Sequence, residues 1–118
     1  MKENIIQEKS FQFAIRIVNL YKYLISNKKE YVLSKQILRS GTSIGANIEE
    51  SIGGRSDKEF LFKLELSYKE ARETIYWLKL LKETNFISNI EFENIHLEAQ
   101  EICKILAKII ITLKNKDK

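Results

Sequence analysis

The chain has 118 residues and no proline, which favours a single domain built from long helices joined by short polar or glycine turns. Charged residues make up 31%, and Leu, Ile, Lys and Glu dominate, which suits amphipathic helices and argues against disorder. The net charge of +4 permits contact with nucleic acid or an anionic surface, and a solubilising charged surface explains it as well. Because Cys103 is the single cysteine, an intramolecular disulfide is excluded. Residues 1–8 lack the apolar run of a signal peptide, and no apolar run is long enough to span a membrane. We therefore expect a soluble cytoplasmic protein without a membrane part.

The first predicted helix runs from about Ile5 or Ser10 to Ile25. Its polar stripe consists of Gln12, Arg16, Asn19 and Ser26. The other positions are mostly apolar: Phe11, Phe13, Ala14, Ile15, Ile17, Val18, Leu20, Tyr21 and Leu24. This apolar arc is wider than one bundle core needs. We therefore expect a second buried contact, with another subunit.

The second predicted helix runs from about Tyr31 to Ile52, after a polar break at residues 26–29. Apolar and small residues recur at three- and four-residue steps: Leu33, Ile37, Ser40, Gly41, Ile44, Ile48 and Ile52. An interior glycine costs a helix about 1 kcal/mol relative to alanine. Gly41 and Gly45 therefore indicate close backbone approach to another helix, with a loop through 41–45 as the alternative.

Two further helices follow, each opened by a capping box. Gly53 and Gly54 end the second helix, and Ser56 with Glu59 begins a third that reaches about Glu83. Its predicted core face is Phe60, Leu64, Ser67, Ala71, Ile75, Leu78 and Leu81, with Glu59–Lys63 and Glu65–Lys69 as exposed pairs. Ser88 and Glu91 open the fourth helix, whose heptad seam is Phe92, Ile95, Ala99, Ile102, Leu106, Ile109 and Leu113.

Short breaks between consecutive helices force neighbours to run antiparallel. The sequence thus predicts an all-α, up-down-up-down four-helix bundle, one domain over 1–118 with its core in about 9–113. We expect the lysine-rich segment after Leu113 to fray.

Catalytic and metal chemistry has little support in the residues. Glu93 and His96 have the Glu-x-x-His spacing of di-iron bundles, but such sites need two pairs and the chain has one histidine. We expect no catalytic, cofactor or metal site, and a surface or interface role for His96. The alternative is a metal-dependent enzyme with a carboxylate and histidine site in the bundle core. Cys103 is interpreted as a small, partly buried apolar residue.

Polar side chains border the apolar stripe of the second helix. Asn47 and Glu50 are three residues apart, and Arg39 lies eight before Asn47. They form either a polar rim or a hydrogen-bonded cluster with Arg55 that fixes the corner between the second and third helices or a subunit contact. Tyr76 and Trp77 lie off the core face of the third helix; exposed aromatics here anchor a protein interface or stack on single-stranded bases.

Several motifs resemble a known family. They are Phe11-Gln12-Phe13-Ala14, Gln36-Ile37-Leu38-Arg39-Ser40, Ser43 through Ser51, Gly54-Arg55-Ser56-Asp57-Lys58-Glu59-Phe60, and Ser67 with Glu70. Over about residues 9–113 the chain resembles the four-helix-bundle proteins encoded in intervening sequences of bacterial 23S rRNA genes, to which diversity-generating retroelement accessory proteins are related. Phe11 replaces the family's tryptophan, Gly45 its proline and Ser51 its glycine.

The resemblance implies a homo-oligomeric bundle, with a pentamer expected, and carries over no catalytic residue. The related accessory proteins bind a reverse transcriptase and nucleic acid. We therefore expect a non-enzymatic scaffold that contacts RNA, DNA or a nucleic-acid-handling protein. The residues expected to bind nucleic acid or a partner are Lys35, Arg39, Arg55, Lys104, Lys108 and Lys114. Those expected at structural or subunit contacts are Gly41, Gly45, Asn47 and Glu50.

Overall fold

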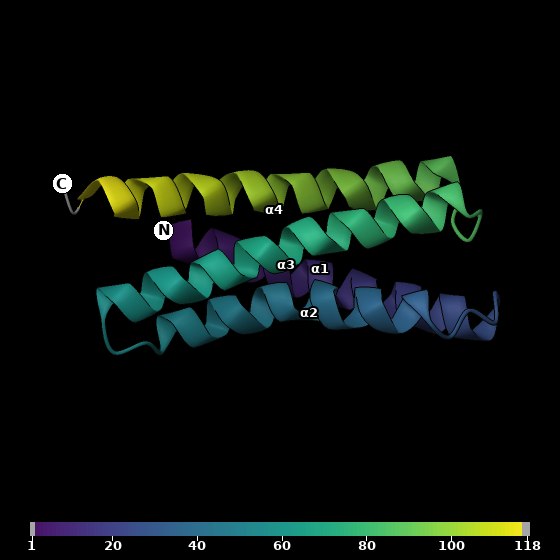
Figure 1. The fold of residues 1–118 in the computed structure, drawn as a ribbon, viewed down its shortest axis with the longest axis horizontal. Coiled ribbons are helices and arrows are strands. Elements are labelled where there is room, and N and C mark those ends of the chain that lie inside the picture. Colours follow the sequence, from purple (N-terminus) through teal and green to yellow (C-terminus); the bar gives the residue numbers. More distant parts are fainter. Residues whose placement is uncertain (1, 117–118) are drawn as a thin grey trace.

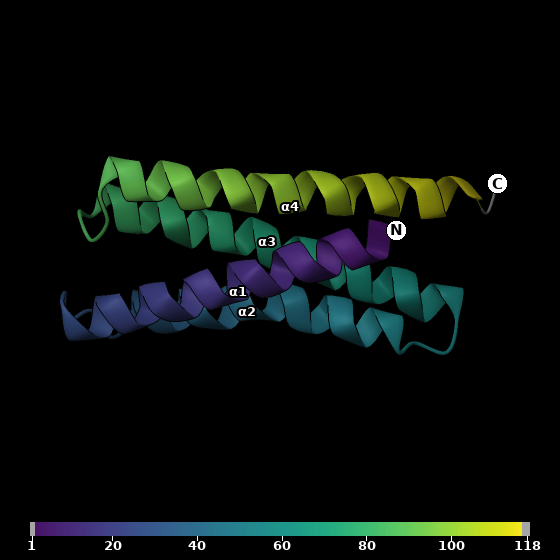
Figure 2. The same ribbon diagram turned by 180° about the vertical axis from the view of Figure 1, so that it is seen from behind.

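Four antiparallel helices form an elongated bundle of 49 × 22 × 21 Å in the computed structural model, which describes residues 2–116 (Figure 1). They are α1 (Lys2–Ser26), α2 (Leu33–Ile52), α3 (Asp57–Glu83) and α4 (Asn89–Lys116). Each helix returns alongside its predecessor, so both ends of the chain lie at the same end of the bundle (Figures 1 and 2). The predicted all-α four-helix bundle is confirmed. None of the described helices has the length and apolar character of a membrane span.

The core follows the predicted helical periodicity, because each helix buries the stripe that repeats every three to four residues. The largest fully buried side chains are Ile6, Phe13, Ile17, Leu24, Ile37, Ile44, Ile48, Leu64, Leu78, Leu81, Ile102 and Leu106. The predicted core residues Leu33, Phe60 and Leu113 are only half-buried at the edge of the core, and two further positions differ more. Ile52 is 47% exposed and Ser51 is buried in its place, because α2 ends at Ile52. The sequence pattern placed Ile75 in the core, but Ile75 is half-buried and Thr74, the residue before it, is buried instead.

Close approach of α1 and α2 centres on Gly41. A Cβ atom built on Gly41 would lie 2.8 Å from both γ carbons of Ile17, which is fully buried. A Cβ atom on Gly45 would meet Ser10 at 3.4 Å, an ordinary contact. Residues 41–45 are helical, which excludes the alternative of a loop. Close packing is therefore confirmed as a requirement at Gly41, and Gly45 has room for a methyl group.

Side chains cap the helices at both predicted boxes. The Glu59 and Glu91 N–H groups donate to the hydroxyls of Ser56 and Ser88, each at 3.1 Å. The Glu91 carboxylate also accepts from the Ser88 N–H at 3.0 Å, which closes the second box. Gly53 is the C-cap of α2 as expected, with an ordinary φ of −83°.

Asn85 ends α3 in the left-handed region, at a φ of 66°. The Asn85 N–H donates to the Lys82 carbonyl at 3.0 Å, and the Phe86 N–H donates to the Leu81 carbonyl at 2.9 Å. These two bonds are the Schellman pattern, and asparagine is a residue that tolerates its conformation.

The start of α2 is capped from a distance by Glu30. Its carboxylate accepts hydrogen bonds from the N–H groups of Val32 at 3.1 Å, Leu33 at 3.0 Å and Ser34 at 2.6 Å. Burial acts to raise the pKa of Glu30, but the backbone hydrogen bonds outweigh it and the net pKa is lowered. The helix begins at Leu33, two residues after the predicted start, because these bonds satisfy its first free N–H groups.

Two helices are longer than predicted. The α1 helix begins at Lys2, ahead of the predicted Ile5 or Ser10, and Ile6 adds a buried turn to the core. The α4 helix continues through Lys116, past the predicted end at Leu113. An ion pair of 2.9 Å between Lys114 and Glu65 of α3 anchors its last turns. Lysines at a helix C-terminus also interact favourably with the helix dipole.

Candidate interaction surfaces

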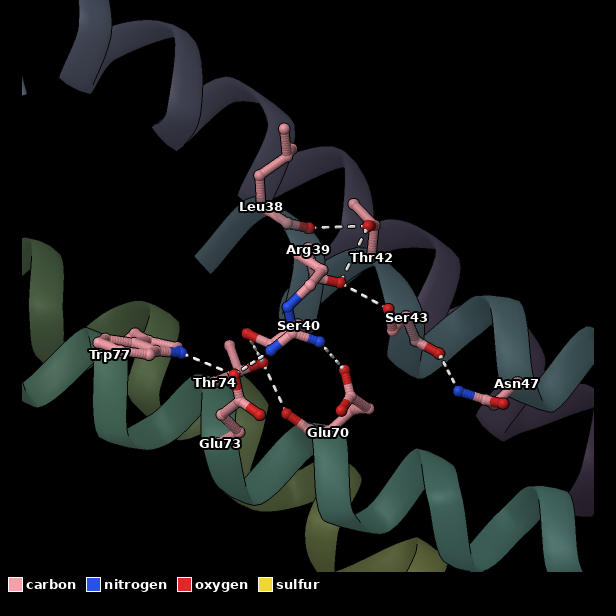
Figure 3. A network of polar contacts seen from close by, with 10 residues as sticks. All are labelled: Leu38, Arg39, Ser40, Thr42, Ser43, Asn47, Glu70, Glu73, Thr74 and Trp77. Carbon is pink, nitrogen blue, oxygen red and sulfur yellow. Dashed lines mark hydrogen bonds and ion pairs between the residues drawn. The ribbon is translucent and has the colours of Figure 1, made fainter. Parts of the chain in front are cut away.

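The interface between α2 and α3 is the most extensive in the bundle and contains buried hydroxyl groups. The Thr74 hydroxyl donates to the Glu70 carbonyl at 2.8 Å, and its oxygen lies 2.9 Å from that of Ser40 (Figure 3). The Ser67 hydroxyl donates to the Ile44 carbonyl at 2.8 Å. Among the described residues every buried side-chain nitrogen and oxygen has a partner. Satisfied polar groups inside an interface fix the register of the two helices.

Arg39 continues this network to the surface. Its guanidinium donates to Glu70 at 2.9 Å and also to Glu73, and Glu73 accepts from the indole N–H of Trp77 at 2.9 Å (Figure 3). The Trp77 hydrogen bond lowers the pKa of Glu73, burial opposes this, and the nearby Arg39 lowers it further. The charge of Arg39 is therefore balanced by two carboxylates. Sequence reasoning missed Glu70 and Glu73 as its partners, although their three-residue spacing places both on one face of α3.

Asn47, Glu50 and Arg55 do not join Arg39 in one cluster. The Asn47 amide donates to the Ser43 carbonyl on its own helix at 2.9 Å. Glu50 forms an ion pair of 2.8 Å with Lys63 of α3. Arg55 is exposed in the turn between the helices. The predicted cluster around Arg55 is thus wrong, because Arg39, Asn47 and Glu50 each bond to another residue and the Arg55 side chain is exposed, and the polar rim describes these residues.

The outer face of α1 is apolar and lies away from the bundle core. We define it as Phe11, Ala14, Ile15 and Val18, which share one side of the helix at three- and four-residue steps, and exposed Lys22 ends the apolar run on this side. Phe11 is 63% exposed and Ile15 is 42% exposed. Phe11 and Ala14 also border a hollow of about 250 Å³ between α1 and α2, which is lined on α2 by Thr42, Gly45, Ala46 and Glu49. Gln7 also lines this hollow and donates to Glu49 at 2.6 Å, so a polar pair borders its small residues. An exposed aromatic side chain beside such a hollow can anchor a partner helix.

The six predicted basic residues are not gathered into one patch. Lys35 lies near the start of α2 and Arg55 follows its end, so a helix of 20 residues separates them. Arg39 and Lys114 are engaged in the ion pairs with Glu70, Glu73 and Glu65. Lys35, Arg55, Lys104 and Lys108 are exposed and form no ion pair with the described part of the chain.

Glu93 and His96 lie outside the bundle core. Glu93 is exposed, and the His96 ring stacks on Phe92 with 4.6 Å between centroids. Residues 2–116 contain no group of three or more histidine, cysteine, aspartate or glutamate side chains that could hold a metal ion. Within the described residues, the structure therefore contains no carboxylate and histidine site of the kind that the alternative of a metal enzyme requires.

Comparisons with known proteins agree with the family resemblance. The model of the family described as 23S rRNA-intervening sequence protein matches residues 2–108. A similar solved structure is the crystal structure of a protein with unknown function from the S23 ribosomal protein family of Bacteroides thetaiotaomicron. That protein is 53% identical, with a TM-score of 0.92, over 93% of this chain and 98% of its own. No curated protein matches the chain.

Proposed function

Because the chain belongs to the 23S rRNA-intervening sequence protein family, and its outer α1 face is apolar, we propose that it is a non-enzymatic homo-oligomeric scaffold in the cytoplasm. The exposure of Phe11 and Ile15 carries this proposal. Fully burying one such side chain contributes about 1.5–3 kcal/mol. Five subunits are the number expected from the family resemblance.

The apolar residues of this face are contiguous rather than scattered, which supports a second copy of the chain as its partner. Isolated exposed hydrophobic side chains are normal on a monomer. Here, however, Phe11, Ala14, Ile15 and Val18 are contiguous along two turns of one helix, and the hollow beside them contains small residues bordered by the hydrogen-bonded pair Gln7 and Glu49. A contiguous apolar patch is the usual mark of a protein–protein contact.

Charge substitution at this face tests the proposal. We expect Phe11→Glu to lower the mass measured by light scattering during size exclusion, because a buried unpaired carboxylate opposes association. The matched control is Leu97→Glu on α4, where the parent side chain is 58% exposed and lies among charged residues. Neither change touches the bundle core, so both variants should keep the helical signal of the parent. Equal masses for Phe11→Glu and parent would contradict the proposed interface.

We also propose that the assembly contacts RNA, DNA or a nucleic-acid-handling protein. The supporting observation is that Lys35, Arg55, Lys104 and Lys108 are exposed without an ion pair in the described part of the chain. An oligomer would repeat each weak contact and raise the total affinity. Fluorescence anisotropy with labelled RNA tests this: binding should weaken steeply with salt. Binding that salt does not change would contradict a phosphate contact.

A further inference from the structure

A basic groove runs between α3 and α4, which lie side by side in the bundle (Figure 1). Its hollow has a volume of about 300 Å³. Arg72, Ile75 and Lys79 line it from α3, and His96, Cys103 and Lys104 line it from α4. Three cations from two facing helices therefore point to one space, and no carboxylate is among the described residues that line it.

The cations of this groove lack a glutamate partner, as Lys35, Arg55 and Lys108 also do, and what distinguishes them is that they line one hollow. Lys9, Arg16, Arg39, Lys63 and Lys114 each pair with a glutamate. By contrast, Arg72, Lys79 and Lys104 form no ion pair within residues 2–116. The Arg72 guanidinium donates only to the Tyr68 hydroxyl, at 3.3 Å. A groove with three uncompensated positive charges attracts an anion.

The pKa of His96 depends on the charge of this groove. Burial, followed by the positive charges of Lys79 and Lys82, lowers the pKa of His96. Its ring stacks on Phe92, and the Lys82 ammonium lies 4.6 Å from the centre of the Phe92 ring on the other helix. Glu93, one turn earlier on α4, is exposed to solvent. The imidazole is thus neutral at pH 7, and an anion placed beside it would favour its protonated form.

We propose that this groove binds the phosphodiester backbone of a single-stranded nucleic acid. Arg72 and Lys79 are seven residues apart on α3, about 10 Å along a helix, so the cations extend over a length greater than one phosphate group. Tyr68, whose hydroxyl accepts a hydrogen bond from Arg72, lines a separate hollow of about 360 Å³ together with Ala107, Ile111 and the ion pair of Glu65 and Lys114. An elongated cationic groove beside aromatic side chains is the usual binding site for single strands. This proposal rests on the proposed contact with nucleic acid and locates that contact in the groove between α3 and α4.

Paired charge removals test the position. Lys79→Gln/Lys104→Gln removes two groove cations, and Lys29→Gln/Lys58→Gln removes two exposed cations elsewhere on the bundle that are not among the residues expected to bind nucleic acid. With a short fluorescein-labelled oligoribonucleotide at low salt, the groove variant should bind about tenfold more weakly, while the control stays near the parent. Its salt slope should also fall by about 0.7 for each phosphate contact removed. Equal losses in the two variants would overturn the assignment to the groove.

The single histidine supplies a local readout. With ¹³C-labelled histidine, the oligoribonucleotide should raise the His96 pKa more than inorganic phosphate or an acidic peptide does at equal charge, because a strand places several phosphates in the groove at once. A similar rise with inorganic phosphate or the peptide would overturn the strand as occupant. If anisotropy reports binding but the pKa of His96 does not change, only the assignment to the groove is overturned. If the parent protein does not bind at all, the proposed nucleic-acid contact itself is contradicted.

Discussion

At the residue scale, Gly41 and Gly45 have similar sequence contexts but different surroundings. We expect Gly41→Ala to lower the free energy of unfolding by about 1–3 kcal/mol, because its methyl group would overlap the branched side chain of Ile17. Gly45→Ala should be neutral or stabilising by up to about 1 kcal/mol, since alanine favours helix and its methyl group has room. Urea titration followed by circular dichroism measures both. Equal effects would mean that Ile17 moves aside.

Glu30 gives a prediction for acid conditions. Its folded pKa is lowered, so its contribution to stability is present above the unfolded pKa of about 4.3 and is lost as pH falls through the folded pKa. We expect Glu30→Gln to destabilise the protein by about 1 kcal/mol at pH 7, as loss of a helix cap does. The difference from the parent should shrink below about pH 4. A difference that is constant with pH would contradict a charged cap.

Gly41 and Glu30 also show which contacts of a single residue can be predicted from the sequence. A glycine inside a helical pattern indicates that something lies close, so the contact at Gly41 was predictable. The identity of the neighbour was not, because the pattern of α1 does not say at which height it crosses α2. Glu30 lies outside the usual capping spacing, and only the folded turn brings its carboxylate onto three N–H groups.

At the scale of the elements, the hydroxyl pair of Ser40 and Thr74 joins α2 to α3. We expect Thr74→Val to cost about 1–3 kcal/mol, because it leaves the Ser40 hydroxyl without its partner in a buried place. The double variant Ser40→Ala/Thr74→Val should recover part of this loss, since neither helix then buries an unpaired hydroxyl. A double-mutant cycle from thermal unfolding measures the coupling. Additive effects would mean that the two side chains act independently.

Ion pairs between helices were not predictable from the helices themselves. The sequence suggested Glu59–Lys63 and Glu65–Lys69 pairs along α3. In the folded chain Lys63 pairs with Glu50 of α2, and Glu65 pairs with Lys114 of α4. Spacing along one helix identifies neighbours on that helix, and the packing of the bundle adds closer partners from others. The helix starts at Ser56 and Ser88 were predictable because both caps are local.

At the scale of the whole molecule, the fold followed from periodicity, capping boxes and short turns. The outer face of α1 followed from the same pattern, as apolar positions in excess of one core. The groove between α3 and α4 was missed. Lys104 was among the predicted binding residues, but Arg72 and Lys79 lie on a different helix and look like ordinary surface charges until the packing of α3 on α4 brings all three together.

The mass of the parent protein in solution tests the central claim of a homo-oligomeric scaffold most directly. Light scattering during size exclusion, repeated over a dilution series, gives the mass without assuming a shape. Five copies of the 13.9 kDa chain have a mass of about 70 kDa, and we expect this value to persist on dilution until the assembly dissociates. A mass of 13.9 kDa at every concentration would contradict the scaffold and leave the apolar face of α1 without a partner of its own kind.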